Sequence, residues 1–111
     1  MKRHIALVGG RCVGKTTTAR ALAERLELPL YVIDDLISEE VGQTISEFIA
    51  EFGWSDFRDL EYEVLKDVCG REDGVIDCGG GIVCEQSVTG RQTYSERKCS
   101  LLDEHALVFW L

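Results

Sequence analysis

The chain has 111 residues and a formal net charge of −8 at pH 7, a length that supports one hydrophobic core and one domain over residues 1–111. Its acidic balance argues against a surface for nucleic acid or for anionic membranes, because both attract clustered Lys and Arg. No apolar run approaches the roughly 20 residues of a membrane span, and none near the N-terminus has the length of a signal-peptide core, so we expect a cytoplasmic protein.

The N-terminal third of the sequence has the pattern of a β-α-β unit. Residues 5–8 form a short apolar run that stops at Gly9, which is typical of a buried parallel strand. Apolar residues then recur with the period of a helix until Pro29 ends the pattern. A second short apolar run covers residues 30–33. A strand, a crossover helix and a second strand predict a parallel sheet.

Helical patterns fill the middle of the chain. The first is interrupted at Gly42. Thr44 and Glu47 have the spacing of a capping box, so a new helix should start there. Gly53 breaks that helix, and a further helix follows whose apolar residues between positions 57 and 68 face the core.

The C-terminal part contains two further apolar runs. Val75 and Ile76 begin a third strand, and residues 107–111 have the pattern of a fourth. Between them, residues 84–100 are polar and weakly patterned, and we expect a loop with some helix. A buried parallel strand needs helices on both of its faces. The sequence therefore looks cut short after the fourth strand.

Residues 9–16 match the phosphate-loop pattern G-x-x-x-x-G-K-[ST] and lie between a predicted strand and a predicted helix. Gly9 and Gly14 allow backbone angles with which successive N–H groups point at an anion. Lys15 can place its ammonium on the β- and γ-phosphates, and the Thr16 hydroxyl can bind Mg²⁺. The predicted nucleotide-binding residues are Gly9, Gly10, Arg11, Cys12, Val13, Gly14, Lys15, Thr16 and Thr17.

Further polar and glycine residues follow the predicted strands, where small-metabolite kinases bind their acceptor. Asp34 follows the second strand, and Arg58 and Glu61 lie one turn apart in a helix. Three glycines after the third strand allow close approach to a ligand. Each feature has a structural alternative: a helix cap, a surface ion pair and a tight turn. The predicted acceptor-binding residues are Asp34, Arg58, Glu61, Gly79, Gly80 and Gly81.

In their order and spacing, these residues resemble the shikimate kinase family. The resemblance covers residues 5–111, about the first two-thirds of that family's usual length. It implies ATP-dependent phosphorylation of the shikimate 3-hydroxyl, with ATP and Mg²⁺ as cofactors. It implies that Lys15 and Asp34 are catalytic, with Asp34 taking the proton of that hydroxyl. Arg58 would bind the shikimate carboxylate in a bidentate pair, oriented by Glu61.

The same resemblance implies a three-layer α/β/α P-loop kinase fold. Its parallel sheet would have the strand order 2-3-1-4, with the fifth strand missing from this chain. A monomer is implied, although an uncovered sheet edge would favour dimers.

The sequence also departs from the family's pattern. Val32 stands where the family usually has the first aspartate of a D-x-D motif, and Asp34 keeps the second. We expect Asp77 to replace the missing carboxylate, so that the metal would be held by Thr16, Asp34 and Asp77. The family's lid segment and its arginines lie beyond the fourth strand. Two alternatives therefore stay open: a non-catalytic nucleotide-binding fragment or pseudoenzyme, and a related kinase for gluconate or a nucleoside monophosphate.

Overall fold

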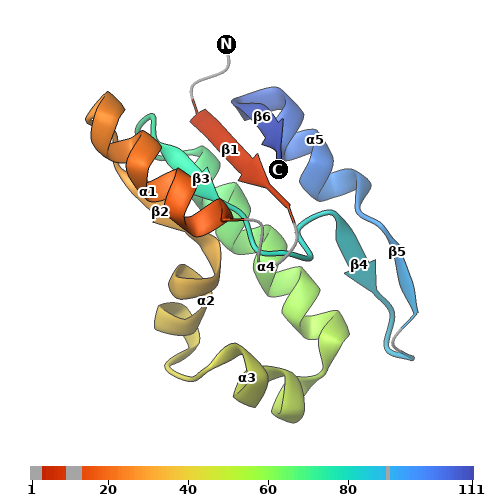
Figure 1. Ribbon diagram of the computed structural model, residues 1–111. Coiled ribbons are helices and arrows are strands. Elements are labelled where there is room, and N and C mark those ends of the chain that lie inside the picture. The colour runs from red at the N-terminus through yellow and green to blue at the C-terminus, as the bar shows by residue number, and fades with distance from the viewer. Residues whose placement is uncertain (1–3, 10–13, 90) are drawn as a thin grey trace.

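A parallel sheet of four strands runs through the centre of the protein (Figure 1). The computed structural model describes residues 4–9, 14–89 and 91–111. The strands of this sheet are β1 (His4–Val8), β2 (Leu30–Val32), β3 (Val75–Asp77) and β6 (Ala106–Trp110). They lie in the order β2-β3-β1-β6, and neighbouring strands are parallel. The predicted α/β class and the order 2-3-1-4 are confirmed, with β6 as the fourth strand of the sheet.

Helices cover both faces of the sheet. They are α1 (Lys15–Leu26), α2 (Ile33–Val41), α3 (Ile45–Phe52), α4 (Trp54–Cys69) and α5 (Glu96–His105). On one face, Leu7 and Val75 of the sheet pack with Ala19 and Ala23 of α1. On the other, a larger cluster that includes Leu65 of α4 joins the sheet to α2, α4 and α5. These are the three expected layers.

The second strand is one residue shorter than predicted. Ile33 begins α2 instead of ending β2, and its side chain is fully buried. A short apolar run does not distinguish a strand from a helix, so this boundary could not be read from the pattern. Asp34 and Asp35 lie in the first turn of α2, where their negative charge favours the helix by interacting with its dipole.

The polar segment predicted as a loop with some helix contains a β-hairpin as well as α5. Strands β4 (Cys84–Gln86) and β5 (Gln92–Tyr94) pair in antiparallel fashion. These strands are only three residues long and carry half-buried or exposed side chains, so they lack the apolar alternation that marks a strand in a sequence. Ser95 caps α5, because its hydroxyl accepts a hydrogen bond from the Lys98 N–H.

Helix α3 begins with the predicted capping box. The Thr44 hydroxyl accepts from the Glu47 N–H at 3.1 Å, and the Glu47 carboxylate accepts from the Thr44 N–H at 2.9 Å. Gly53, with a φ of 91°, joins α3 to α4 in a conformation that favours glycine. One short turn therefore sets the direction of both helices.

Strand β6 forms one edge of the sheet. Its residues Leu107, Phe109 and Trp110 are 52%, 50% and 67% exposed. The monomer implied by the family resemblance, and the alternative of dimers through an uncovered edge, both stay predictions. Within the described ranges, no helix combines the length and the apolar character needed to cross a bilayer.

Candidate active site

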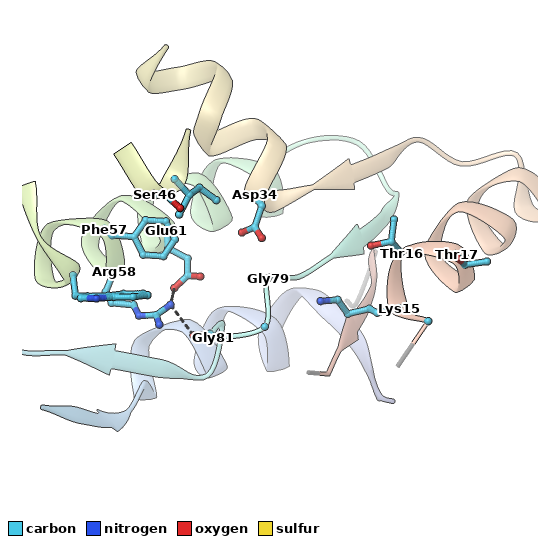
Figure 2. Close-up of a pocket in the computed structure, with 14 residues that line it drawn as sticks. Lys15, Thr16, Thr17, Asp34, Ser46, Phe57, Arg58, Glu61, Gly79 and Gly81 are labelled. Carbon is cyan, nitrogen blue, oxygen red and sulfur yellow. Dashed lines mark hydrogen bonds and ion pairs between the residues drawn. The ribbon is translucent and has the colours of Figure 1, made fainter. Parts of the chain in front are cut away.

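A cavity of about 730 Å³ lies at the carboxyl ends of β2 and β3, beside the start of α1. Parallel α/β folds bind their ligands at this edge of the sheet. Figure 2 shows Lys15 at one end of the cavity, Arg58 at the other and Asp34 between them. Most residues predicted from the sequence line it: Gly14, Lys15, Thr16, Thr17, Asp34, Arg58, Glu61, Gly79, Gly80 and Gly81.

The first turn of α1 forms the phosphate end of the cavity. Gly14 has a φ of 78°, a left-handed conformation that favours glycine, and α1 starts at the next residue. The N-terminus of α1 thus presents N–H groups that have no acceptor within the helix, together with the positive end of a helix dipole. Four predicted phosphate-loop residues lie outside the described residues: Gly10, Arg11, Cys12 and Val13.

Asp77 lies beside the phosphate end, at the last position of β3. Its carboxylate accepts a hydrogen bond from Thr16 Oγ1 at 3.0 Å and lies 3.6 Å from the Lys15 ammonium. Asp77 is 4% exposed and is not one of the residues that line the cavity. Its carboxylate is buried next to Lys15 and Thr16, two residues that do line the cavity.

Thr16 and Asp77 bring a hydroxyl and a carboxylate oxygen together, and both suit Mg²⁺. Mg²⁺ commonly takes only one or two protein ligands, together with phosphate oxygens and water. Across the part of the chain that the structure describes, no three His, Cys, Asp or Glu side chains gather into a metal-binding group. The residues present therefore fit a cation that arrives with a nucleotide better than one held in a protein cage.

Asp34 lies in the first turn of α2, next to the backbone of Gly79. A Cβ at Gly79 would come within 2.6 Å of Asp34 Oδ1, so the absence of a side chain there makes room for the carboxylate. The N-cap of α2 is Val32 and not Asp34. The alternative role of Asp34 as a helix cap is therefore wrong, and its carboxylate lines the cavity.

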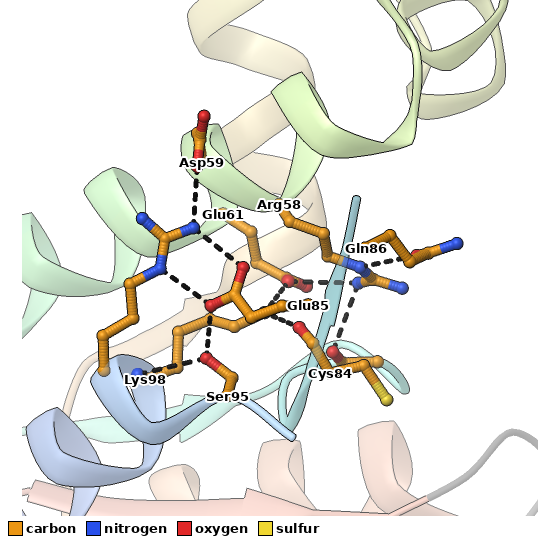
Figure 3. Close-up of polar contacts among 10 residues, drawn as sticks. Arg58, Asp59, Glu61, Cys84, Glu85, Gln86, Ser95 and Lys98 are labelled. Atoms are coloured by element: carbon orange, nitrogen blue, oxygen red, sulfur yellow. Dashed lines mark hydrogen bonds and ion pairs between the residues drawn. The ribbon is translucent and has the colours of Figure 1, made fainter. Parts of the chain in front are cut away.

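Arg58 and Glu61 are 5% and 1% exposed, so the alternative of a surface ion pair is wrong. Arg58 Nη1 donates to Glu61 Oε1 at 3.1 Å and to the Gly81 carbonyl at 3.2 Å. Arg58 Nε donates to Gln86 Oε1 at 2.8 Å (Figure 3). These bonds fix the guanidinium at the cavity wall, and they leave Nη2 without a hydrogen bond to any described residue.

Aromatic residues that the sequence analysis did not assign to the site also line this end. The guanidinium carbon of Arg58 lies 5.1 Å from the ring centre of Trp54 and 5.3 Å from that of Phe57, within the range of cation–π contacts. Ile45 and Ser46, in the first turn of α3, complete the wall. Their sequence signal is weak, because apolar and aromatic residues on a helix most often pack in a core.

Glu61 has a second cationic partner that the sequence analysis missed. Lys98 of α5 is fully buried, and its ammonium donates to the Glu61 carboxylate and, at 2.6 Å, to the Cys84 carbonyl (Figure 3). Burial raises the pKa of Glu61, while the charges of Lys98 and Arg58 oppose that rise. Lys98 is 37 residues from Glu61 in the chain and belongs to a segment without a clear pattern, so no local signal pointed to it.

The cavity thus has a cationic group at each end and a carboxylate between them. The α1 end, with Lys15, suits the phosphates of a nucleotide. The Arg58 end suits a carboxylate. Asp34 lies where it can take a proton from a hydroxyl group of a ligand that fills the space between. This arrangement can support phosphoryl transfer to a small carboxylated alcohol.

Comparison with known proteins relates the sequence to one family. A family model described as shikimate kinase matches residues 11–111. The shikimate kinase of Leptospira biflexa serovar Patoc is 34% identical over 109 residues, which are 97% of this chain and 60% of that protein. That of Leptospira borgpetersenii serovar Hardjo-bovis is 37% identical over 114 residues, covering 100% of this chain and 64% of that protein.

Solved structures give the same relation. Shikimate kinase from Acinetobacter baumannii, solved in complex with shikimate, superposes with a TM-score of 0.86 at 30% identity, covering 100% of this chain and 56% of that one. Shikimate kinase from Aquifex aeolicus has a TM-score of 0.82 at 28% identity, covering 97% and 58%. The chain spans about 60% of the length of the curated relatives it matches.

Proposed function

Because this chain belongs to the shikimate kinase family, we propose that it binds MgATP and shikimate and transfers the γ-phosphate to the 3-hydroxyl of shikimate. The three groups that this reaction needs lie in one cavity, with Lys15 at the phosphate end, Arg58 at the other end and Asp34 between. The family's solved complex with shikimate in Acinetobacter baumannii supports the choice of acceptor. The product would be 3-phosphoshikimate.

The nucleotide would bind at the N-terminus of α1. Its phosphates would accept hydrogen bonds from backbone N–H groups of the phosphate loop and from the Lys15 ammonium. Thr16 and Asp77 are the residues best placed to hold Mg²⁺, with Asp34 on the acceptor side. Bound there, Mg²⁺ would neutralise negative charge on the phosphates.

The acceptor would bind between Asp34 and Arg58. Three of the five guanidinium hydrogens of Arg58 go to Glu61, Gly81 and Gln86, which leaves the two on Nη2 for the shikimate carboxylate. A bidentate pair that also uses Nε requires Gln86 to move away. With the carboxylate held there, the ring hydroxyls would reach Asp34, which would take the proton of the attacking hydroxyl.

Calorimetric titration of shikimate into the protein, with and without saturating MgATP, tests this proposal alongside an assay of ADP release. The wild type should bind shikimate, and Arg58→Ala should weaken binding roughly 30-fold or more, because a desolvated charge partner is lost. Arg20→Ala, which removes an exposed arginine of α1, is the matched control and should bind like the wild type.

Circular dichroism should show the same helix content in both variants. If the wild-type protein binds MgATP but not shikimate, the proposal that shikimate is the acceptor is wrong. Equal affinity of wild type and Arg58→Ala would instead contradict the role given to Arg58.

A further inference from the structure

Lys98 is a lysine with none of its surface exposed to solvent. Burial of an ammonium group is costly unless the charge is paired and hydrogen-bonded, so its contacts define its role. The ammonium donates to Glu61 of α4 and to the carbonyl of Cys84 in β4. It therefore joins three elements, α4, α5 and the hairpin, behind the wall of the cavity. Lys98 does not itself line the cavity.

Lys98 and Arg58 share one carboxylate. Glu61 Oε1 accepts from both of them, and all three side chains are buried. Two cations and one anion leave one positive charge in surplus within this buried group. Farther out, Arg97 pairs with Glu85 and Asp59, which leaves one negative charge in surplus there, and the charge of Lys98 also acts on Glu85. These outer groups are partly exposed, so water screens them more than it screens the buried group. The buried positive surplus lies next to the acceptor end of the cavity.

We propose that Lys98 is a positioning residue of the acceptor site: by sharing the Glu61 carboxylate, it leaves the charge of Arg58 in surplus for the carboxylate of a bound acceptor. The inference rests on the proposed function, which assigns that carboxylate to Arg58. Without Lys98, the negative charge of Glu61 would fully balance the positive charge of Arg58. An anionic ligand would then have to compete with Glu61 for the same guanidinium.

A single variant that removes the surplus charge and a double variant that restores it can distinguish an electrostatic role of Lys98 from a role in packing. Lys98→Met keeps most of the side-chain volume but makes the buried group neutral. It should weaken shikimate binding about tenfold, as expected for one charge lost a short distance from the ligand in a partly desolvated site, and leave MgATP affinity unchanged. The double variant Lys98→Met with Glu61→Gln restores the single positive charge and should recover most of the lost affinity. Lys66→Met, on the exposed face of α4, is the control.

The results of these titrations test the role of Lys98 separately from the proposed shikimate kinase function. If the double variant binds as weakly as Lys98→Met or more weakly, Lys98 acts by packing and the inference is overturned. Titration of the same proteins with benzoate, a simple ring carboxylate, provides a readout that does not depend on shikimate. The affinity for benzoate could be highest in the wild type, lower in the double variant and lowest in Lys98→Met, while none of the three proteins binds shikimate. That result would support the role of Lys98 and contradict only shikimate as the acceptor. If the wild type binds neither carboxylate, both are overturned.

Discussion

Gly79 and Gly81 leave space that the side chains of Asp34 and Arg58 occupy. Neither has a positive φ, so their own backbone angles do not require glycine. A Cβ at Gly81 would lie 2.6 Å from both Nη atoms of Arg58, and one at Gly79 would lie 2.6 Å from Asp34 Oδ1. A Cβ at Gly80 would meet nothing closer than 4.0 Å. Two of the three glycines thus make room for the two acceptor-site side chains, and the middle one does not.

Gly81→Ala should therefore weaken shikimate binding while Gly80→Ala should not. The new methyl group displaces the flexible end of Arg58 and leaves the fold intact, so we expect a loss of roughly tenfold, less than the full removal of a buried charged partner. Calorimetric titration of both variants checks this. A Gly80→Ala variant that loses as much affinity as Gly81→Ala would show that the loop needs glycine for another reason.

At the scale of elements, the β4–β5 hairpin is fastened to the helices by charged side chains. Glu85 of β4 accepts from Arg97 Nε at 2.7 Å and from Nη2 at 2.8 Å, and the Ser95 hydroxyl also donates to it. Arg97 bonds Asp59 of α4 as well, and its guanidinium carbon lies 4.7 Å from the ring centre of Tyr62. The hairpin supplies Gln86 and the Cys84 carbonyl to the Arg58 network, so its attachment supports the site.

Acid should weaken this attachment. Hydrogen bonding from Arg97 lowers the pKa of Glu85 to about 2, against about 4.3 for a free glutamate. A lowered folded-state pKa stabilises the fold above the unfolded value, and that contribution is lost as the pH falls from about 5 toward 2. Because the pair is partly exposed, Glu85→Gln should cost only about 1 kcal/mol at pH 7.

Urea unfolding of wild type and Glu85→Gln at pH 7, 5 and 3 measures both effects. The difference in unfolding free energy should shrink as the pH falls, whereas Glu63→Gln, an exposed position on α4, should match the wild type throughout. A difference that stays constant with pH would mean that Glu85 acts through packing rather than through its charge.

For the whole molecule, sheet register decides which carboxylate meets the phosphate loop. Val32 of β2 and Asp77 of β3 are paired residues in neighbouring parallel strands. Paired side chains point to the same face of a sheet, and here that face carries α1. We propose that Asp77, on the adjacent strand and 3.0 Å from the Thr16 hydroxyl, replaces the carboxylate that is absent at Val32.

Asp77→Asn should weaken ATP binding in the presence of Mg²⁺ about tenfold and leave binding in EDTA nearly unchanged, because a metal ligand or its orienting partner is lost. Isothermal titration of ATP in the two buffers measures the ratio without any turnover. Asp103→Asn, an exposed position on α5, is the control. If Asp77→Asn has the same ratio of ATP affinities with Mg²⁺ and with EDTA as the wild type, Asp77 does not contribute to Mg²⁺ binding.

Much of the candidate site could be predicted because its residues lie in short local patterns. The phosphate loop, Asp34 and the glycine run each follow or begin a regular element, and parallel strands bring such positions to one edge. Arg58 and Glu61 have the i,i+3 spacing of one helical turn within α4. Residues such as Lys98 and Gln86 carry no local pattern. They act through contacts with chain segments many residues away.

The sequence by itself determined the family, the parallel α/β architecture and the residues at the two ends of the cavity, because periodicity and motif spacing act over a few residues. Only the tertiary structure decided the burial of the Arg58–Glu61–Lys98 group, the β4–β5 hairpin and the pairing of Asp77 with Val32. The physical reason is that burial, strand register and charge sharing depend on which distant segments pack together, and no single stretch of sequence specifies that.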